Sequence, residues 1–394
     1  MMIRSLYLNK IKPFMHSELI KILIGVRRSG KSTLLKQIID ELLIQNISEN
    51  QIIYMNFEDY ELNAYKEADS LHQYLINHLS AHKKTYIFLD EIQEVSQFER
   101  VVNSLNAMKD VDIYLTGSNS KMLSGEYATL LTGRYKSFHI FPFSFKEMNM
   151  FHPHMEPKSL FNLYLSYGGF PVIQMFDHED QKIAILKDLY DSVVIKDIVH
   201  RYQVKNVDVL DKYMSYLMNT IASQFSAQNV SNYFKKEGRS ISKETLYNYI
   251  EYAKNVLLIY SAKRYDVKGK RLLSTNEKYF VNDQGFRATQ FDNPKDIEKI
   301  LENMVFFELL RRDYEVTIGQ IEDKEIDFIA SKKGQIEYYQ VSYLMSTEKT
   351  REREFSSLLQ IKDQFPKYVL SMDEINFSQA GIQHKNLIDF LLET

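Results

Sequence analysis

The sequence contains no cysteine in its 394 residues. A disulfide framework, a thiolate metal site and a cysteine nucleophile are therefore excluded, and a reducing cytoplasm is the expected compartment. Nothing in the chain approaches the roughly 18 consecutive apolar residues of a membrane-spanning helix, and the charged amino terminus lacks the apolar run of a signal peptide. We therefore expect a cytoplasmic protein without a membrane partner.

An excess of charge of one sign is also missing. The 49 Lys and Arg against 52 Asp and Glu leave a formal net charge of −3, so the chain as a whole has no general attraction for nucleic acid. Any affinity for DNA must come from a local surface. Hydrophobic residues at 44% are typical of globular proteins, and the length predicts about two to four domains.

Short apolar runs alternate with amphipathic stretches from residue 20 to about residue 145, a pattern typical of parallel strands joined by crossover helices. Residues 32–43 place apolar side chains at helical spacing, which predicts a helix that packs on the sheet. We expect a doubly wound α/β domain over residues 1–145. Its predicted strands are Ile20–Ile24, Ile52–Asn56, Tyr86–Leu89, Ile113–Thr116 and Phe138–Phe141.

Three further units are expected in the rest of the chain. Residues 146–225 have a helical pattern. Residues 226–285 predict a helix-turn-helix with a wing, because two short helical stretches precede two apolar strands around the basic turn 268–271. Residues 286–394 predict a small α/β domain, in which a helix precedes a run of strands.

The loop after the first predicted strand has the spacing of a phosphate-binding loop. Gly25 and Gly30 bracket four residues, and Lys31-Ser32 follow directly. Such glycines let backbone N–H groups close around a β-phosphate, and the following helix points its positive end at the anion. Lys31 is expected to reach the β- and γ-phosphates, and the Ser32 hydroxyl to ligate magnesium. The residues expected to hold the nucleotide are Gly25, Val26, Arg27, Arg28, Ser29, Gly30, Lys31, Ser32, Thr33 and Ser118.

An acidic pair, Asp90-Glu91, follows the third predicted strand. Asp90 is expected to hold magnesium, directly or through water, and Glu91 to polarise the attacking water as general base. The adjacent pair favours hydrolysis over passive binding. Because no Asn-Lys-x-Asp guanine signature occurs, the expected ligands are ATP and Mg²⁺.

Two further positions are candidates for completing the site. Ser118 or Asn119, after the fourth predicted strand, would sense the γ-phosphate or orient the water, and the alternative is a capped turn without chemistry. Arg134 stands at the start of the next strand. In a ring of subunits it would reach the γ-phosphate of a neighbour, whereas in a single chain it would form a surface salt bridge. The sequence leaves these alternatives and the oligomeric state open.

These motifs resemble the prokaryotic AAA-type ATPases that carry a carboxy-terminal domain of unknown function, and the resemblance covers nearly the whole chain. It implies an AAA+ core with a helical lid over 146–225, then a winged helix, then a degenerate fold similar to restriction-type nucleases. The motifs that carry it are the phosphate loop, Phe88-Leu89-Asp90-Glu91-Ile92-Gln93, Leu115-Thr116-Gly117-Ser118, Leu131-Thr132-Gly133-Arg134, Pro142-Phe143-Ser144-Phe145 and Gly168-Gly169-Phe170-Pro171.

The predicted winged helix is locally basic. Residues 231–280 contain eleven Lys or Arg and five Asp or Glu, an excess of six positive charges. Ser242 is expected to cap the second helix, whose start would contact DNA as a recognition helix does. A module that docks proteins, with a merely solvated basic face, is the alternative. The side chains expected to contact double-stranded DNA are Lys243, Lys268, Lys270 and Arg271.

In the last domain, polar residues stand where related nucleases keep an acid on a helix, an acid on a strand and a Glu-x-Lys motif on the next strand. Glu302 or Glu308 lies on a predicted helix, Asp327 on a strand, and Gln340 and Ser342 on the next strand. Phosphodiester cleavage needs carboxylates to hold the metal and a lysine for the developing charge, which Gln340 and Ser342 do not supply. We therefore expect packing or binding from this domain.

The predicted function is magnesium-dependent ATP binding and hydrolysis that drives or switches a winged-helix module on DNA. Two alternatives remain open. One is a nuclease whose activity ATP regulates, and the other is a slow ATPase that acts as a switch in protein–protein signalling without DNA.

Overall fold

The computed structural model describes residues 2–108, 110–120, 131, 133–239, 241–290 and 296–393. The chain divides into two compact units, residues 1–141 with 255–257, and residues 142–254 with 258–394. The predicted domain boundaries at residues 145, 225 and 285 are finer than this division and stay predictions.

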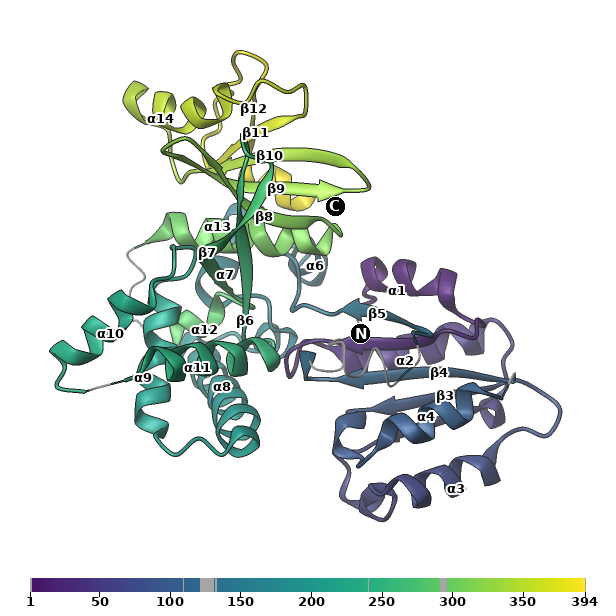
Figure 1. Cartoon of the computed structure of the whole chain (residues 1–394). Coiled ribbons are helices and arrows are strands. Elements are labelled where there is room, and N and C mark those ends of the chain that lie inside the picture. Colours follow the sequence, from purple (N-terminus) through teal and green to yellow (C-terminus); the bar gives the residue numbers. More distant parts are fainter. Residues whose placement is uncertain are drawn as a thin grey trace. The chain divides into compact units, whose positions relative to one another are not determined.

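The first unit is built on a five-stranded, fully parallel sheet in the order β2-β3-β4-β1-β5 (Figure 1). This confirms the predicted parallel α/β fold. The strands are β1 (Ile20–Ile24), β2 (Ile52–Asn56), β3 (Thr85–Asp90), β4 (Val111–Gly117) and β5 (Tyr135–His139). The helices are α1 (Ser5–Ile11), α2 (Lys31–Ile44), α3 (Ala68–His78) and α4 (Phe98–Asn106), with short 3₁₀ turns at Lys12–Phe14, Glu49–Gln51, Tyr60–Tyr65 and Ile92–Glu94.

The predicted strands coincide with β1 and β2 and lie inside β3 and β4, but β5 both begins and ends earlier than the predicted Phe138–Phe141. Every residue of β1 is buried, and four of the five are isoleucine or leucine, with Lys21 as the exception, so sequence analysis detects the strand. β5 lies at the edge of the sheet and starts with the polar residues Tyr135 and Lys136, of which Lys136 is exposed. An edge strand needs no continuous apolar run, and its start is therefore invisible in the sequence pattern.

Helix α2 anchors the phosphate loop to the sheet. Leu34, Leu35, Ile38 and Leu42 are fully buried and belong to one apolar cluster with Leu23 of β1. Burying such a side chain contributes about 1.5–3 kcal/mol, so this face of four residues fixes the helix firmly. Because α2 begins at Lys31, its packing also fixes where the loop ends.

The second unit combines helices with a seven-stranded mixed sheet in the order β12-β11-β10-β9-β8-β6-β7 (Figure 1). Among the described residues, no helix is both long enough and apolar enough to cross a bilayer. The strands are β6 (Ile259–Asp266), β7 (Arg271–Val281), β8 (Glu315–Ile321), β9 (Lys324–Lys332), β10 (Gln335–Val341), β11 (Lys367–Ser371) and β12 (Gln383–Asn386). The helices are α6 (Phe145–Phe151), α7 (Pro157–Tyr167), α8 (Glu179–Asp191), a π-helical segment (Ser192–His200), α9 (Val207–Asn219), α10 (Ala227–Lys236), α11 (Lys243–Asn255), α12 (Gly285–Ala288), α13 (Ile297–Arg311), α14 (Glu348–Leu359) and α15 (Leu387–Leu392), with a 3₁₀ turn at Pro171–Met175.

The hairpin β6–β7 lies in the same sheet as the strands of the last domain, although the sequence predicts a domain boundary between them at residue 285. β6 pairs antiparallel with β7 and parallel with β8, where Arg264 lies opposite Ile318. The two predicted helices precede the hairpin, and the Ser242 hydroxyl accepts the N–H of Thr245 at 3.0 Å, which is the expected cap. The predicted wing therefore belongs to the same sheet as the last domain. A winged helix and a nuclease-like fold stay predictions.

Two motifs of the family resemblance meet inside the second unit. The carbonyl of Gly169 accepts the N–H of Phe143 at 2.7 Å, and a Cβ at position 169 would lie 2.2 Å from the Phe143 carbonyl oxygen. The carboxylate of Asp283 accepts the N–H groups of Gly169 at 2.7 Å and of Gly285 at 2.8 Å. Burial raises the pKa of Asp283 to about 6. These motifs therefore build the interior of the second unit.

Candidate functional site

The phosphate loop connects β1 to α2 at the carboxyl edge of the first sheet. The N–H of Gly25 donates to the carbonyl of Gly117 at 3.3 Å, and a Cβ on Gly25 would lie 2.1 Å from the carbonyl oxygen of Ile140. Gly30 has a φ of 97°, a conformation that side chains rarely adopt. Both glycines are thus required by their surroundings.

Lys31 is buried and reaches back across the loop. Its Nζ donates to the carbonyls of Gly25 at 3.0 Å and Val26 at 3.3 Å, and lies 3.2 Å from Oε1 of Glu91. The side chains of Lys31 and Glu91 are 3% and 8% exposed, so water screens this ion pair little. The structure therefore brings the predicted phosphate-binding lysine and the predicted base together.

Glu91 is held in a strained conformation, with φ 53° and ψ 47°. Non-glycine residues in this region cost energy and are enriched at functional sites. Its N–H donates to Oγ1 of Thr116 at 2.8 Å, and its Oε2 accepts from Nε2 of Gln93 at 2.6 Å. Burial alone would raise the pKa of Glu91, but the Lys31 charge and the Gln93 hydrogen bond hold this pKa below its ordinary value. The carboxylate is therefore ionised at neutral pH and able to accept a proton.

Asp90 ends β3 and is fully buried. Its Oδ1 accepts a hydrogen bond from the Thr116 hydroxyl, and its Oδ2 accepts one from the Tyr54 hydroxyl at 3.0 Å. Burial, together with the charge of Asp90, raises the pKa of Tyr54. Two neutral hydroxyl groups thus orient the carboxylate, and its remaining lone pairs are available to a cation.

These residues fit a magnesium ion that is bound together with a nucleotide. Ser32 adjoins Lys31 and Asp90 adjoins Glu91, so the contact between Lys31 and Glu91 brings two hard oxygen donors to one edge of the sheet. In the described part of the chain, no group of three or more His, Asp or Glu side chains is placed to hold a metal ion by itself. Magnesium commonly uses one or two protein ligands and completes its shell with phosphate and water.

Ser118 is tied to this cluster through Gln93. It is buried, and its Oγ accepts from Nε2 of Gln93 at 3.4 Å, the same amide nitrogen that donates to Glu91. Asn119 follows β4 and is half-buried. The contact connects Ser118 to Glu91, and the roles of Ser118 or Asn119 in sensing the γ-phosphate or orienting the water stay predictions.

Arg134 lies at the amino end of the strands, whereas the phosphate loop lies at their carboxyl end. Its carbonyl accepts the N–H of Ile20, the first residue of β1, at 3.0 Å, whereas the phosphate loop follows the last residue of that strand. A five-residue strand spans about 16 Å, which exceeds the reach of an arginine side chain. Arg134 is exposed and therefore does not belong to the site of its own chain. Its predicted contact with a neighbouring subunit stays a prediction. Thr132 of the same motif lies outside the described residues.

Three residues of the site had no predicted role: Thr116, Gln93 and Tyr54. Thr116 is a hydroxyl residue at the carboxyl end of a buried strand, and this position could have identified it from the sequence as a site residue. Gln93 lies within a recognised motif. Tyr54 has no signal of its own, because its contact with Asp90 depends on the pairing of β2 with β3.

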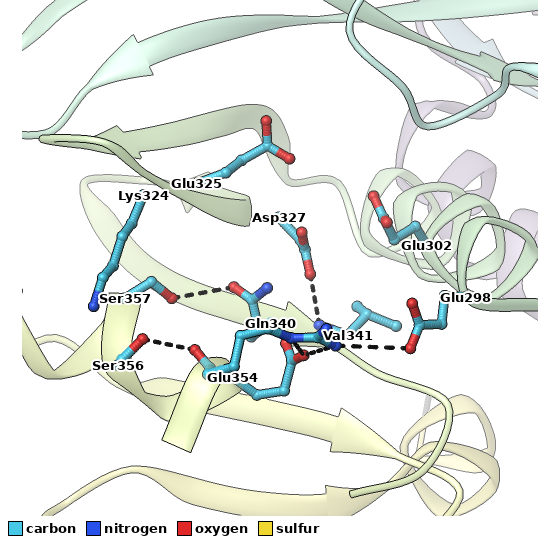
Figure 2. Close-up of a pocket in the computed structure, with 11 residues that line it drawn as sticks. Glu298, Glu302, Lys324, Glu325, Asp327, Gln340, Val341, Glu354, Ser356 and Ser357 are labelled. Carbon is cyan, nitrogen blue, oxygen red and sulfur yellow. Dashed lines mark hydrogen bonds and ion pairs between the residues drawn. The ribbon is translucent and has the colours of Figure 1, made fainter. Parts of the chain in front are cut away.

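The predicted residues of the last domain line a separate pocket within the second unit. Figure 2 shows Glu302 from α13, Asp327 from β9 and Gln340 from β10 around a cavity of about 340 Å³. Glu308, the alternative acid, instead pairs with Arg312 at 2.9 Å. Ser342 is fully buried and is absent from the lining. Glu302 rather than Glu308 therefore accompanies Asp327.

Lys278 of β7 brings a cation to these acids. Its Nζ lies 3.0 Å from Oε2 of Glu302 and 2.6 Å from Oε1 of Glu325, and its side chain is 4% exposed. Burial opposes its charge, but the surrounding carboxylates outweigh burial and raise the pKa of Lys278. Burial and the nearby Glu302 charge raise the pKa of Asp327 well above its ordinary range. The acids of this pocket thus have an internal counter-ion.

Comparisons with known proteins agree with the geometry of the first unit. Residues 17–149 match a family described as an AAA domain, and residues 158–296 match a domain of unknown function, DUF8612. An uncharacterized protein of Haemophilus influenzae is 38% identical over 400 residues, which cover 100% of this chain and 99% of that protein. The chain belongs to the same family as this Haemophilus protein. The uncharacterized protein MJ1544 of Methanocaldococcus jannaschii is 32% identical to this AAA-domain protein over 378 residues, covering 91% and 80% of the two chains.

A solved structure supports the fold of this AAA-domain protein. The Walker-type ATPase PABY2304 of Pyrococcus abyssi superposes with a TM-score of 0.50, covering 73% of this chain and 95% of that chain. At 14% identity the likeness shows the fold alone.

Proposed function

We propose that this AAA-domain protein binds ATP with magnesium and hydrolyses it. The observation that carries the proposal is the position of Glu91, ionised, buried and 3.2 Å from the phosphate-loop lysine Lys31. Ser32 and Asp90 would hold magnesium, which neutralises phosphate charge when it is bound. Glu91 would accept the proton of the attacking water.

Lys31 has two competing anionic partners in this proposal. In the structure it neutralises Glu91, and the phosphates of ATP would compete for the same ammonium group. A phosphate that draws Lys31 away leaves Glu91 without its counter-ion and raises its affinity for a proton. Nucleotide binding would therefore prepare the base for the hydrolytic step.

Replacing Lys31 with alanine tests the proposed site. The wild-type protein is expected to release phosphate from ATP only with a divalent cation, whereas Lys31→Ala is expected to lose nucleotide binding because its charge no longer faces the phosphates. Titration calorimetry and phosphate release measure the two effects. Lys36→Ala, on the exposed face of the same helix, is the matched control and should behave as wild type. Unchanged binding in Lys31→Ala would contradict the assignment of the loop.

We further propose that ATP hydrolysis acts on a basic module, residues 226–285, whose partner is duplex DNA. The excess of six positive charges between residues 231 and 280 supports this partner. Two of the predicted contact residues already have acidic neighbours, since Lys268 pairs with Glu322 and Arg271 lies 3.8 Å from Asp266. The side chains of Lys268 and Arg271 are both exposed, and ion pairs of exposed cations are weak enough for phosphates to displace them.

A salt series with duplex DNA tests this partner. If all six excess charges neutralise phosphates, the logarithm of affinity should fall against the logarithm of salt concentration with a slope of roughly −5. The triple variant Lys268→Ala, Lys270→Ala, Arg271→Ala should bind more weakly and flatten the slope by about 3. An unaltered slope would place the contacts elsewhere. A wild-type ATPase rate that is indifferent to DNA would favour the switch in protein–protein signalling.

The pocket at Asp327 does not favour a nuclease. A divalent cation would meet Lys278 among its acids, and the pocket is lined by Gln340 where related nucleases keep a carboxylate. No step of phosphodiester chemistry is therefore assigned to these residues. Plasmid cleavage that requires magnesium or manganese and disappears in Asp327→Ala would overturn this conclusion.

A further inference from the structure

Arg4 is a buried arginine behind the phosphate loop. It is 1% exposed. Its Nη1 donates to the carbonyl oxygen of Ser29 at 2.8 Å, and its Nη2 donates to the carbonyl oxygen of Phe141 at 2.9 Å. Ser29 belongs to the loop, and Phe141 directly follows Ile140, whose carbonyl packs against Gly25. One guanidinium group therefore contacts the loop and the segment that supports it.

The bond to Ser29 fixes the direction of one N–H group of the loop. In a planar trans peptide, the C=O and N–H groups point in opposite directions. The carbonyl of Ser29 and the N–H of Gly30 belong to the same peptide. When Arg4 holds this carbonyl at the back of the loop, the Gly30 N–H faces the front, where a phosphate loop binds its anion.

This peptide needs an external constraint. Gly30 has a φ of 97°, and a glycine there leaves neighbouring peptide groups more conformational freedom than any other residue does. Rotation of the Ser29–Gly30 peptide would turn a carbonyl oxygen toward the phosphates in place of an N–H group. The two-armed guanidinium opposes that rotation, because it is itself held at Phe141.

Contacts around Arg4 show why an arginine occupies this position. Its backbone N–H donates to Oε1 of Gln37 on α2 at 3.0 Å, and its guanidinium lies 4.5 Å from the centroid of the Tyr7 ring. Burying a cation is costly unless its donors are used. A planar guanidinium serves two carbonyl groups at once, which the single ammonium group of lysine does less well.

We infer that Arg4 is a positioning residue that aims the Gly30 N–H at the phosphates of the bound nucleotide. This inference rests on the proposed ATP binding. Arg4 lies behind the loop and acts through Ser29, so it affects the affinity for phosphate groups. The N–H serves substrate and transition state alike, and its loss therefore raises KM more than it lowers kcat.

Arg4→Met and Arg4→Lys in the full chain test this role. Arg4→Met keeps the apolar stem and removes the donors, and we expect its affinity for ADP and ATP to fall about 10- to 100-fold, the loss of one hydrogen bond to a charged group. KM should rise with little change in kcat. Arg4→Lys retains one donor group and should lie between Arg4→Met and wild type. In the ADP complex, the Gly30 amide should exchange hydrogen faster in both variants.

Tyr7→Phe is the matched control. It removes the hydrogen bond from the Phe141 N–H to the Tyr7 hydroxyl, 3.1 Å, and keeps the ring beneath the guanidinium. We expect it to keep the ADP affinity of the wild type. Wild-type KM and ADP affinity in Arg4→Lys would overturn the inference even if Arg4→Met fails to fold. A wild-type protein that binds no nucleotide would overturn the proposed function instead.

Discussion

Glu91→Gln is expected to bind ATP at least as tightly as the wild type and to hydrolyse it about 10²- to 10⁴-fold more slowly. Glutamine keeps the shape of glutamate and cannot take the proton of the attacking water. It also removes the anion 3.2 Å from Lys31 that competes with the phosphates for this lysine. The two effects act in opposite directions on turnover and on affinity, which separates loss of the base from general damage to the site.

Single-turnover phosphate release and a separate ATP titration measure the two quantities. Glu94→Gln is the matched control, because Glu94 is an exposed acid in the same 3₁₀ turn, Ile92–Glu94. It should hydrolyse ATP at the wild-type rate. Unchanged turnover in Glu91→Gln would remove Glu91 as the base. Loss of ATP binding in that variant would instead indicate that Glu91 holds the loop together.

The parts of the site that sequence analysis predicts are those encoded by local patterns. Gly25, Gly30 and Lys31 stand within a few residues of one another, between an apolar strand and an amphipathic helix. Asp90 ends a strand that is buried along its whole length, and Glu91 directly follows it. In a parallel sheet the carboxyl ends of neighbouring strands lie at one edge, so both patterns could be assigned to the same site before the structure was known.

The parts that escaped prediction depend on contacts between distant segments. Arg4 is an isolated charge in the sequence, and only folding places it beside Ser29 and Phe141. Thr116 lies in a predicted strand, but its bonds to Asp90 and Glu91 follow from the pairing of β3 with β4. Periodicity assigns residues to a face and contains no information about which residue of another segment lies opposite.

Lys278 shows how a charge count misassigns a buried residue. The count of eleven Lys and Arg in residues 231–280 includes Lys278 as part of a DNA-binding surface. Its side chain, however, is 4% exposed and pairs with Glu302 and Glu325. The pairing arises because β6 and β7 join the sheet that carries β9. The basic excess available to DNA on this module is smaller than the sequence suggests, and a salt slope shallower than −5 would reflect it.

Lys278→Met is expected to destabilise the second unit by about 3–5 kcal/mol at neutral pH, because it leaves buried carboxylates without their counter-ion. Methionine has a similar volume and no charge. Hydrogen exchange is the suitable measurement, because a chain of two units does not unfold in one transition. Protection in β7 and α13 should fall about 10²- to 10⁴-fold, with β3 and β4 of the first unit as the unchanged reference.

Lys299→Met provides the matched control on α13. Lys299 pairs with Asp296 at 3.0 Å, but the two side chains are 32% and 49% exposed. Exposed pairs of this kind contribute at most about 1 kcal/mol, so this variant should keep nearly all of its protection. Equal losses in Lys278→Met and Lys299→Met would show that the buried charge cluster contributes nothing beyond an ordinary surface pair.

The pH dependence separates the lost charge from lost packing. Burial raises the pKa of Glu302 and of Asp327, and the positive charge of Lys278 lowers both values. Removing Lys278 raises the pKa values of both carboxyl groups further above those of the unfolded chain. The stability of the variant is therefore lost as the pH rises through the folded-state pKa values, and it is regained as the pH falls. The difference in stability between the variant and the wild type should therefore shrink toward acid pH.

Adding Glu302→Gln to Lys278→Met should restore part of the protection at neutral pH, because one uncompensated carboxylate is gone. A loss that is independent of pH and unrelieved by Glu302→Gln would assign the effect of Lys278 to packing.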